Sequence, residues 1–336
     1  MIDYVRLGMD IEIPEEEFDW TRFRTGILKD KTVIWYHRFR GVWVRYYPMR
    51  RRITVTGKIL MLLEDSEVLN VDDVYGLDIP QFVCDINDYL SALFKTIRLD
   101  ILYFHAYRID YCFNVYTPHV AEYVHFMNDA FRQVDNGARI NYTLHKHLDG
   151  SVYIKTKSDY NHNERRNYVL NFYDKADRLK YLSDRKYKIP TRDFEFAQDI
   201  LRLEVQCGFL FIKRLCKKYR IQPLFGNLLD YEIAYYAEKS IYKLIFRSDD
   251  TQDYYTYSAA KKLLPRSEAA ARTLRTASQG HKIIDSKYNY GRELIKKTGV
   301  FPFCFLHRDG KLAMLENPLK LIQRKLEDIG VDMSLL

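Results

Sequence analysis

The sequence predicts an α+β fold, in which helices cover one face of an antiparallel β-sheet and a mostly helical C-terminal domain follows. Several segments alternate apolar and polar residues with a period of two, which is typical of strands with one buried face. From about residue 228 onward helical patterns dominate instead, broken by glycine and proline. Pro223 and Gly226 mark the boundary, which divides the chain into domains at 1–225 and 226–336.

The elements of the first domain follow from the same patterning. Alternation predicts strands, and apolar residues at helical spacing predict helices, two of them opened by a proline. In chain order we expect a strand at 2–13, a meander over 32–63, a helix at 80–97, a strand at 101–116, a helix at 118–134, paired strands around 145–150, a polar loop at 157–167, and a helix at 209–219.

Composition indicates an ordered chain with a basic surface. Of the 336 residues, 47% are hydrophobic and 15% aromatic, which excludes a disordered protein. The formal net charge of +8 is compatible with a polyanionic partner such as nucleic acid. Basic clusters recur along the chain, and Arg165 and Arg166 lie just before a tyrosine-bearing strand. These two arginines are candidate phosphate ligands.

Neither a disulfide framework nor a membrane span is expected. The five cysteines are widely spaced and contain no CxxC pair, so reduced thiols are the simplest interpretation. The longest aliphatic run, Ile59–Leu63, is far too short to cross a bilayer. The N-terminal segment is acidic and unlike a signal peptide. We therefore expect a cytoplasmic protein without a membrane partner.

Three expected strands carry chemically capable side chains on one face. They are YRIDYCFNV (107–115), the start of VLNFYDKADRLK (169–180), and ILRLEVQ (200–206). If the strands share a sheet, two carboxylates, two arginines and a tyrosine share one surface. The side chains on that surface are Arg108, Asp110, Cys112 and Asn114, Asn171 and Tyr173, and Arg202, Glu204 and Gln206.

This residue set suits phosphodiester chemistry with a divalent metal. Mg²⁺ and Mn²⁺ prefer carboxylate oxygens, so Asp110 and Glu204 are candidate ligands, and Asn114 could add a carbonyl oxygen. A tyrosine nucleophile must lose a proton whose pKa is about 10. Tyr173, at the end of its strand, is the candidate. The candidate phosphate-binding groups are Arg108, Arg202 and Lys175.

Two other interpretations of these residues stay open. Buried arginine–carboxylate pairs also stabilise sheets, so Asp110 or Glu204 taken alone is more typical of a salt bridge. A second candidate metal site is the pair His145 and His147, although Lys146 stands between them where an apolar residue is expected. A hairpin turn explains that pair better.

The order of the motifs resembles that of rolling-circle replication initiators. RIDYCFN, GSVYIKTKS, NFYDKADRLK and LRLEVQ follow one another as in the initiators of phages and small Gram-positive plasmids. The likeness is greatest to the filamentous-phage type and extends to staphylococcal plasmid initiators and conjugative relaxases. MIDYVRL and YNYGRELIKKTGVFPFCF are also similar to the phage-type group.

The resemblance implies a nicking-endonuclease-like catalytic domain. By that resemblance Tyr173 is the nicking nucleophile, Asp110 and Glu204 bind the metal, and Lys175 supports the phosphate or the phenolate. Two positions depart from the family pattern. Asn114 stands where plasmid initiators usually carry a second acid. Arg178 stands where many relatives have a glutamate, and Asp177 is the candidate replacement.

The expected function is initiation of rolling-circle replication. The enzyme would nick single-stranded or supercoiled origin DNA with Mg²⁺ or Mn²⁺, form a 5′-phosphotyrosine, and later rejoin the strand. Host helicase and polymerase, and a second copy of the chain, are expected partners. Residues 226–336 would add DNA contacts or recruit replication partners. A relaxase for mobilisation is one alternative. A non-catalytic DNA-binding replication protein is the other.

Overall fold

A computed structural model describes residues 1–134, 142–146, 152–156, 168–185, 187–246, 250–264, 266–279, 286–305 and 312–335. Within these ranges, no helix combines the length and apolar content needed to span a bilayer.

Ten strands of the described part of the chain form one large sheet in which every paired neighbour is antiparallel, as the sequence predicts. Their order across the sheet is β2-β3-β4-β5-β1-β6-β10-β9-β8-β7. The three strands that carry the candidate chemistry, β6, β10 and β9, are therefore adjacent. The bounds are β1 Ile2–Asp10, β2 Arg24–Ile27, β3 Val33–Phe39, β4 Val42–Tyr47, β5 Arg52–Lys58, β6 His105–Tyr116, β7 Tyr142–Lys146, β8 Val152–Thr156, β9 Tyr168–Asp174 and β10 Ile200–Gly208.

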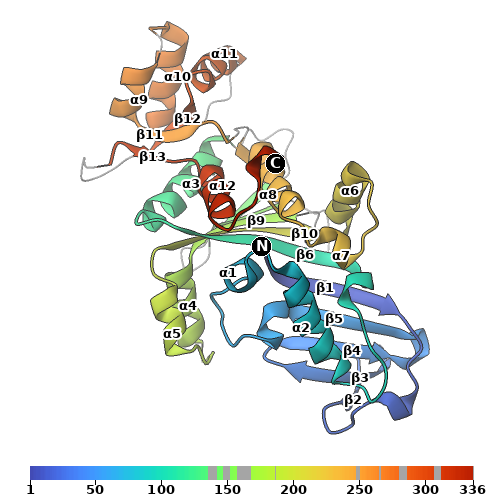
Figure 1. The fold of residues 1–336 in the computed structure, drawn as a ribbon. Helices are drawn as coiled ribbons and strands as arrows, with labels where there is room; N and C mark the ends of the chain where they lie inside the picture. The colour runs from blue at the N-terminus through green and yellow to red at the C-terminus, as the bar shows by residue number, and fades with distance from the viewer. Residues whose placement is uncertain are drawn as a thin grey trace.

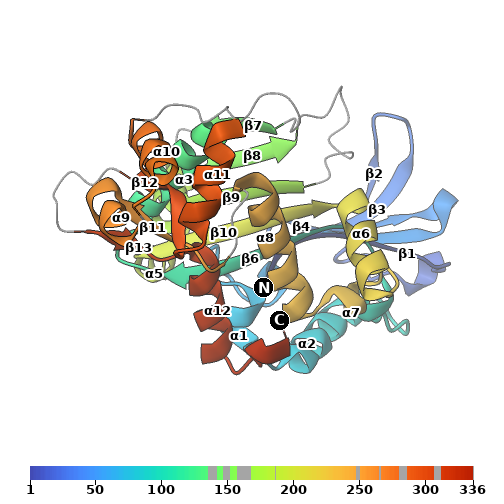
Figure 2. The same ribbon diagram turned by 90° about the horizontal axis from the view of Figure 1, so that it is seen from above.

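Among the described residues, five helices pack on the apolar side of this sheet, and Figure 2 shows α6, α8 and α12 lying over β6 and β10. Alternate residues such as Ile109, Leu203 and Phe172 point toward them and are fully or almost fully buried. The opposite side of the sheet carries the polar residues. The five helices are α2 Ile79–Ser91, α3 Val120–Val134, α6 Phe209–Tyr219, α8 Tyr231–Phe246 and α12 Pro318–Asp328.

Shorter helices occupy the connections. The segment between β5 and β6 contains α1, and the chain passes through α4 and α5 between β9 and β10. Helix α4 begins directly after the tyrosine strand, where the Asp174 side chain accepts from the amides of Ala176 and Asp177. The bounds are α1 Val71–Tyr75, α4 Lys175–Asp184, α5 Thr191–Phe196 and α7 Phe225–Leu228.

The region after residue 226 is mostly helical, but it does not separate from the first domain at that point. Helices α8 and α12 join the core of the large sheet. A smaller unit, whose three strands the helical patterning did not predict, projects from one end of the molecule (Figure 1). It comprises β11 Asp253–Thr256, α9 Tyr257–Leu263, α10 Glu268–Ser278, α11 Ser286–Lys296, β12 Val300–Phe305 and β13 Met314–Leu315.

A β-bulge on β6 changes which side chains face the polar side. Arg6 pairs with Arg108, whereas Leu7 pairs with Ala106, so Tyr107 is an extra residue on β6. A bulge lets two successive residues oppose one residue of the partner strand and re-aims a side chain. Tyr107 accordingly lies with Arg108 on the polar side, where simple alternation would have placed it among the core residues.

A second bulge lies near the start of β1. Ile2 pairs with Tyr111, whereas Tyr4 pairs with Asp110, so Asp3 is the extra residue. Asp3 and Tyr4 both reach the polar side as a result, next to Asp110.

Gly291 allows α11 to lie directly against α10. A Cβ at this position would stand 2.6 Å from the carbonyl oxygen of Ala269 and 2.3 Å from Thr273 Oγ1. Helix propensity alone would make Gly291→Ala stabilising by about 1 kcal/mol. We expect the opposite sign, a loss of about 1–3 kcal/mol in the free energy of unfolding, because the helices must separate. Asn289→Ala, at an exposed position of the same helix, is the control for thermal denaturation.

Glu238 is a carboxyl group of α8 buried beneath the sheet, with 1% exposure, and its Oε1 has no hydrogen-bond partner among the described residues. Burial raises its pKa well above the ordinary value, and Glu204 adds to this, against the Val205 amide and the Met1 ammonium. The folded state therefore holds a proton that the unfolded chain releases above about pH 4.5, so stability falls as pH rises.

Glu238→Gln removes that proton equilibrium. We expect its melting temperature to exceed that of the wild type by an increasing margin between pH 5 and pH 8. Parallel pH profiles for the two proteins would show that Glu238 is ionised in the fold.

Candidate active site on the polar side of the sheet

The register brings the predicted site residues of three strands together. On β10, Arg202 pairs with Asn114 of β6 and with Tyr173 of β9. Two residues further along β10, Glu204 pairs with Cys112 and Asn171. The prediction of one shared surface required the three strands to be adjacent, and in the sheet they are neighbours.

The Tyr173 hydroxyl donates a hydrogen bond to Glu204 Oε2 at 3.1 Å. The other carboxylate oxygen, Oε1, accepts from Asn171 Nδ2 at 2.9 Å and from Gln206 Nε2 at 3.0 Å. Both oxygens of Glu204 are thus oriented by neighbours on its own sheet. The side chain of Tyr173 is 5% exposed, so the phenol lies within the fold with its proton directed at a carboxylate.

Arg202 lies at the centre of a buried network. Its guanidinium lies 2.7 Å from Asp3 Oδ1 and 3.9 Å from Glu204 Oε2, and the residue has no exposed surface. Although burial opposes it, the ion pairs with Arg202 and Lys58 hold the pKa of Asp3 well below its usual range. The structure therefore places Arg202 among protein groups, away from the surface that a phosphate would approach. Its remaining contacts are Val68 O at 3.2 Å, Asn114 Oδ1 at 3.4 Å and Cys112 Sγ at 3.2 Å.

Asp110 forms a two-bond ion pair with Arg108 along the same strand. Arg108 Nε donates to Oδ1 at 2.7 Å and Nη2 donates to Oδ2 at 2.5 Å. Burial raises the pKa of Asp110 to about 7, against the opposing effect of Arg108. The Arg108 guanidinium also lies 4.6 Å from the ring centroid of Tyr4, and its side chain remains one-third exposed. Unlike Arg202, Arg108 can meet a ligand at the surface.

Asp110 and Glu204 fit a hard cation by ligand type. Gln206 pairs with Asp110 and Glu204 with Cys112, so the two acids are diagonal neighbours, with Cα atoms roughly 7–8 Å apart. Two protein carboxylates suit Mg²⁺, which keeps several of its waters. Across the described ranges, no set of three or more histidine, cysteine or acidic side chains is arranged to hold a metal ion. A cation would compete with Arg108 and Tyr173 for the carboxylate oxygens.

Asn114 belongs to a different part of the network. It lies four residues from Asp110 on β6, about 13 Å along the strand, so the two cannot share one ion. Its amide group donates to Val68 O at 3.0 Å and to Asp73 at 2.7 Å. The structure thus gives Asn114 a role in fastening the 66–70 segment.

The segment from Ser66 to Asn70 crosses over Arg202. The carboxylate of Asp193, which is fully buried, accepts from Ser66 Oγ at 2.9 Å and from the Glu67 amide at 2.7 Å. The Val68 side chain packs in a small cluster with Ala176 and Leu179 of α4. This segment closes one side of the site.

Lys175 is buried at the start of α4, and its Nζ lies 5.8 Å from the centroid of the Tyr173 ring. Burial, helped by the charges of Arg202 and Lys58, lowers its pKa well below the usual value. A lysine that gives up its proton readily can act in proton transfer. Asp177 is different: it is exposed and pairs with Lys180 at 3.1 Å.

Sequence patterning missed Asp3 and Lys58, which supply charges beside Arg202. Lys58 Nζ lies 3.5 Å from Asp3 Oδ1. No sequence signal marks the bulge that brings Asp3 to this side. Arg165, Arg166 and His147 lie outside the described residues, and His145 is described only as a member of β7.

Comparison with protein-family models, with curated proteins and with solved structures finds no match for this chain. The site combines a buried tyrosine hydrogen-bonded to a carboxylate, a second carboxylate nearby, two arginines and a buried lysine.

Proposed function

We propose that the protein nicks and rejoins one DNA strand with Tyr173 as the nucleophile, and that it initiates rolling-circle replication in this way. The hydrogen bond from the Tyr173 hydroxyl to Glu204 Oε2 carries the proposal. A phenol is a weak nucleophile until a base takes its proton, and Glu204 is within reach to do so.

The chemistry follows from the positions of the side chains. Tyr173 Oη attacks the phosphorus while its proton passes to Glu204, and the 3′ oxygen of the DNA leaves with its electron pair. The product is a 5′-phosphotyrosine, and attack by a 3′-hydroxyl reverses the step. Asn171 and Gln206 hold Glu204 in place, and Lys175, when it carries its proton, supports the phenolate. Bound Mg²⁺ or Mn²⁺, held by Asp110 and Glu204, would neutralise charge on the phosphate oxygens.

The test is to trap the covalent product. Fragments tiling the replicon that encodes the chain, in supercoiled and single-stranded form, are incubated with the protein and Mn²⁺. We expect a protein–DNA adduct that survives denaturation, and mass spectrometry of the digested adduct should find the nucleotide on the Tyr173 peptide. If the protein binds the fragments but forms a covalent adduct with none of them, the proposal is wrong.

The metal is tested without reference to cleavage. In titrations followed by Mn²⁺ electron paramagnetic resonance, we expect Asp110→Asn and Glu204→Gln each to weaken binding at least about tenfold. Glu268→Gln, which removes an exposed acid on α10, should leave the affinity unchanged. If the wild type and all three variants bind Mn²⁺ with equal affinity, Asp110 and Glu204 do not hold the metal.

One observation favours a non-catalytic DNA-binding protein as the second candidate. Asp110 is already paired with Arg108, and Asp3 with Arg202, so the charges balance within the fold. The adduct experiment separates the two functions. A mobilisation relaxase uses the same chemistry, and transfer genes beside the coding sequence would favour it. The helicase, polymerase and homodimer remain predictions of the replication proposal, as does action in the cytoplasm.

A further inference from the structure

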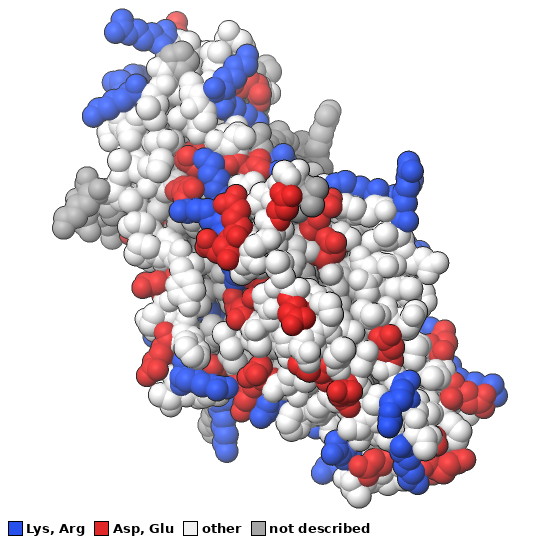
Figure 3. All heavy atoms as spheres, viewed as in Figure 1, with Lys and Arg blue, Asp and Glu red and all other residues white. Residues whose placement is uncertain are grey.

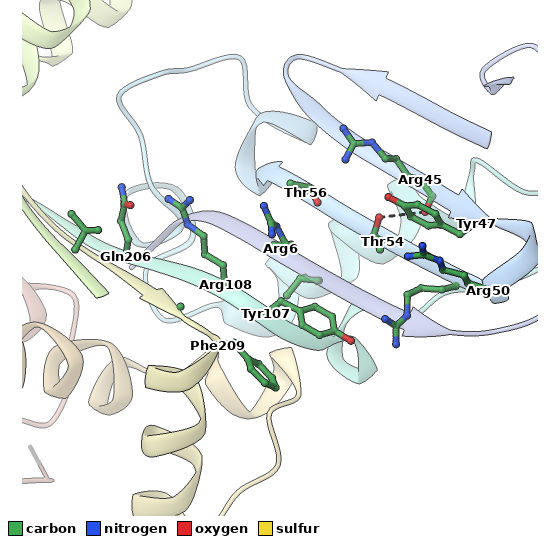
Figure 4. A pocket seen from close by; sticks show the side chains of 14 residues that line it. Arg6, Arg45, Tyr47, Arg50, Thr54, Thr56, Tyr107, Arg108, Gln206 and Phe209 are labelled. Atoms are coloured by element: carbon green, nitrogen blue, oxygen red, sulfur yellow. Dashed lines mark hydrogen bonds between the residues drawn. The ribbon is translucent and has the colours of Figure 1, made fainter. Parts of the chain in front are cut away.

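A hollow of about 810 Å³ lies on the polar side of the sheet, next to the candidate active site. Its floor runs across β4, β5, β1, β6, β10 and β9, five inter-strand steps that span roughly 24 Å. Figure 4 shows Arg6, Arg45, Arg108 and Gln206 on neighbouring strands around it. We call this hollow the arginine groove.

The charge of the groove has one sign. Of the 14 described residues that line it, five are arginines, none is a lysine and none is acidic. By contrast, acidic side chains gather over the middle of the face that carries α2, α8 and α12 (Figure 3). Arginine binds phosphate through a planar pair of N–H groups, so a set of arginines indicates a ligand with several phosphates. The five are Arg6, Arg45, Arg50, Arg52 and Arg108.

Two of these arginines are available for a ligand. Arg45 and Arg50 form no ion pair with any carboxylate in the described ranges, and their guanidinium groups lie over Trp43 and Tyr47 instead. Arg52 is held by Asp10 and Arg108 by Asp110. The groove therefore combines cations that are held in ion pairs with cations that form none with the described residues.

Aromatic rings supply the second kind of surface. The bulge on β6 brings Tyr107 into the groove, where its ring stacks on Phe209 with centroids 6.0 Å apart and an angle of 30°. Gly8 makes room for the ring, since a Cβ there would lie 3.1 Å from Tyr107 Cε2. Flat rings between phosphate-binding groups suit unpaired bases, which stack on aromatic side chains as paired bases cannot.

We infer that the arginine groove binds a single-stranded segment of DNA that continues into the Tyr173 site. Two residues join the groove to that site. Arg108 lines the groove and holds Asp110, and Gln206 lines the groove and donates to Glu204. The continuation into the site rests on the proposed function, whereas binding in the groove does not.

The test uses fluorescence anisotropy with a labelled oligothymidine, in EDTA and with Tyr173→Phe protein, so that no cleavage or origin recognition contributes. The double variant Arg45→Ala/Arg50→Ala should weaken binding at least tenfold. It should also reduce the slope of log K against log salt by about 1.4, because each of two lost phosphate contacts on a single strand contributes about 0.7. Tyr107→Leu should weaken binding about 5- to 150-fold with the salt slope unchanged.

The charge-matched control is Lys95→Ala/Arg98→Ala, which removes two exposed cations directly after α2. Its affinity and salt slope should equal those of the parent. If the groove variants bind as the parent does, or if duplex DNA loses as much affinity as the single strand, the inference is wrong. If the protein fails to nick DNA in separate experiments, the conclusion about binding in the groove still holds, because the anisotropy probe measures binding alone.

Discussion

Tyr173→Phe is expected to lose DNA cleavage and the covalent adduct by at least ~10³-fold, because the substitution removes the nucleophilic oxygen and little else. Folding should be retained. The missing hydroxyl donates one hydrogen bond, to Glu204, whose loss costs about 1 kcal/mol. Cleavage is measured by conversion of supercoiled to open-circular DNA, and the fold by thermal denaturation.

Tyr168→Phe is the matched control, since Tyr168 lies on the same strand and is equally buried, but on the helix-covered side. It should cleave at the wild-type rate. A Tyr173→Phe protein that still forms the adduct would transfer the nucleophile to another of the 28 tyrosines.

Arg202→Met is expected to lower the free energy of unfolding by about 3–5 kcal/mol. The substitution keeps much of the side-chain volume but removes the cation beside Glu204 and leaves Asp3 with Lys58 at 3.5 Å in place of two cations. An unpaired buried charge costs more than the pair itself contributes. Urea denaturation followed by circular dichroism measures the change.

A matched pair shows whether burial is the cause. Arg52 and Asp10 form a similar arginine–aspartate pair at 2.5 Å, but the Asp10 side chain is 69% exposed. Arg52→Met should cost at most about 1 kcal/mol. Adding Asp3→Asn to Arg202→Met should recover part of the loss. Equal costs for Arg202→Met and Arg52→Met would show that the buried network contributes no more than a surface pair.

The parts of the fold that depend on regular alternation could be predicted from the sequence. Ile109, Leu203 and Phe172 follow the period-two rule, and it placed their strands in an antiparallel sheet with the polar residues on the other side. Strand adjacency could not be derived in the same way, because long-range pairing leaves no local pattern.

The rest of the site depends on departures from alternation. Asp3 and Tyr107 reach the polar side only through bulges, and the flanking residues carry no pattern that predicts a bulge. The different roles of Arg108 and Arg202 could not be predicted from the sequence either, since both lie on the polar face in the period-two pattern. Burial separates them: one is partly exposed beside Asp110, and the other is sealed under the 66–70 segment.

The two bulges on the β1–β6 pair also constrain how this chain can gain or lose residues. One adds a residue to β1 and the other a residue to β6, so the shift that begins at Asp3 is cancelled at Tyr107. Deleting either residue alone would leave the remaining bulge uncompensated, so the pairing register of the rest of the β1–β6 ladder would shift by one residue. Deleting both would give a regular ladder without bulges. In homologous chains, a gap at Asp3 should therefore be accompanied by a gap at Tyr107.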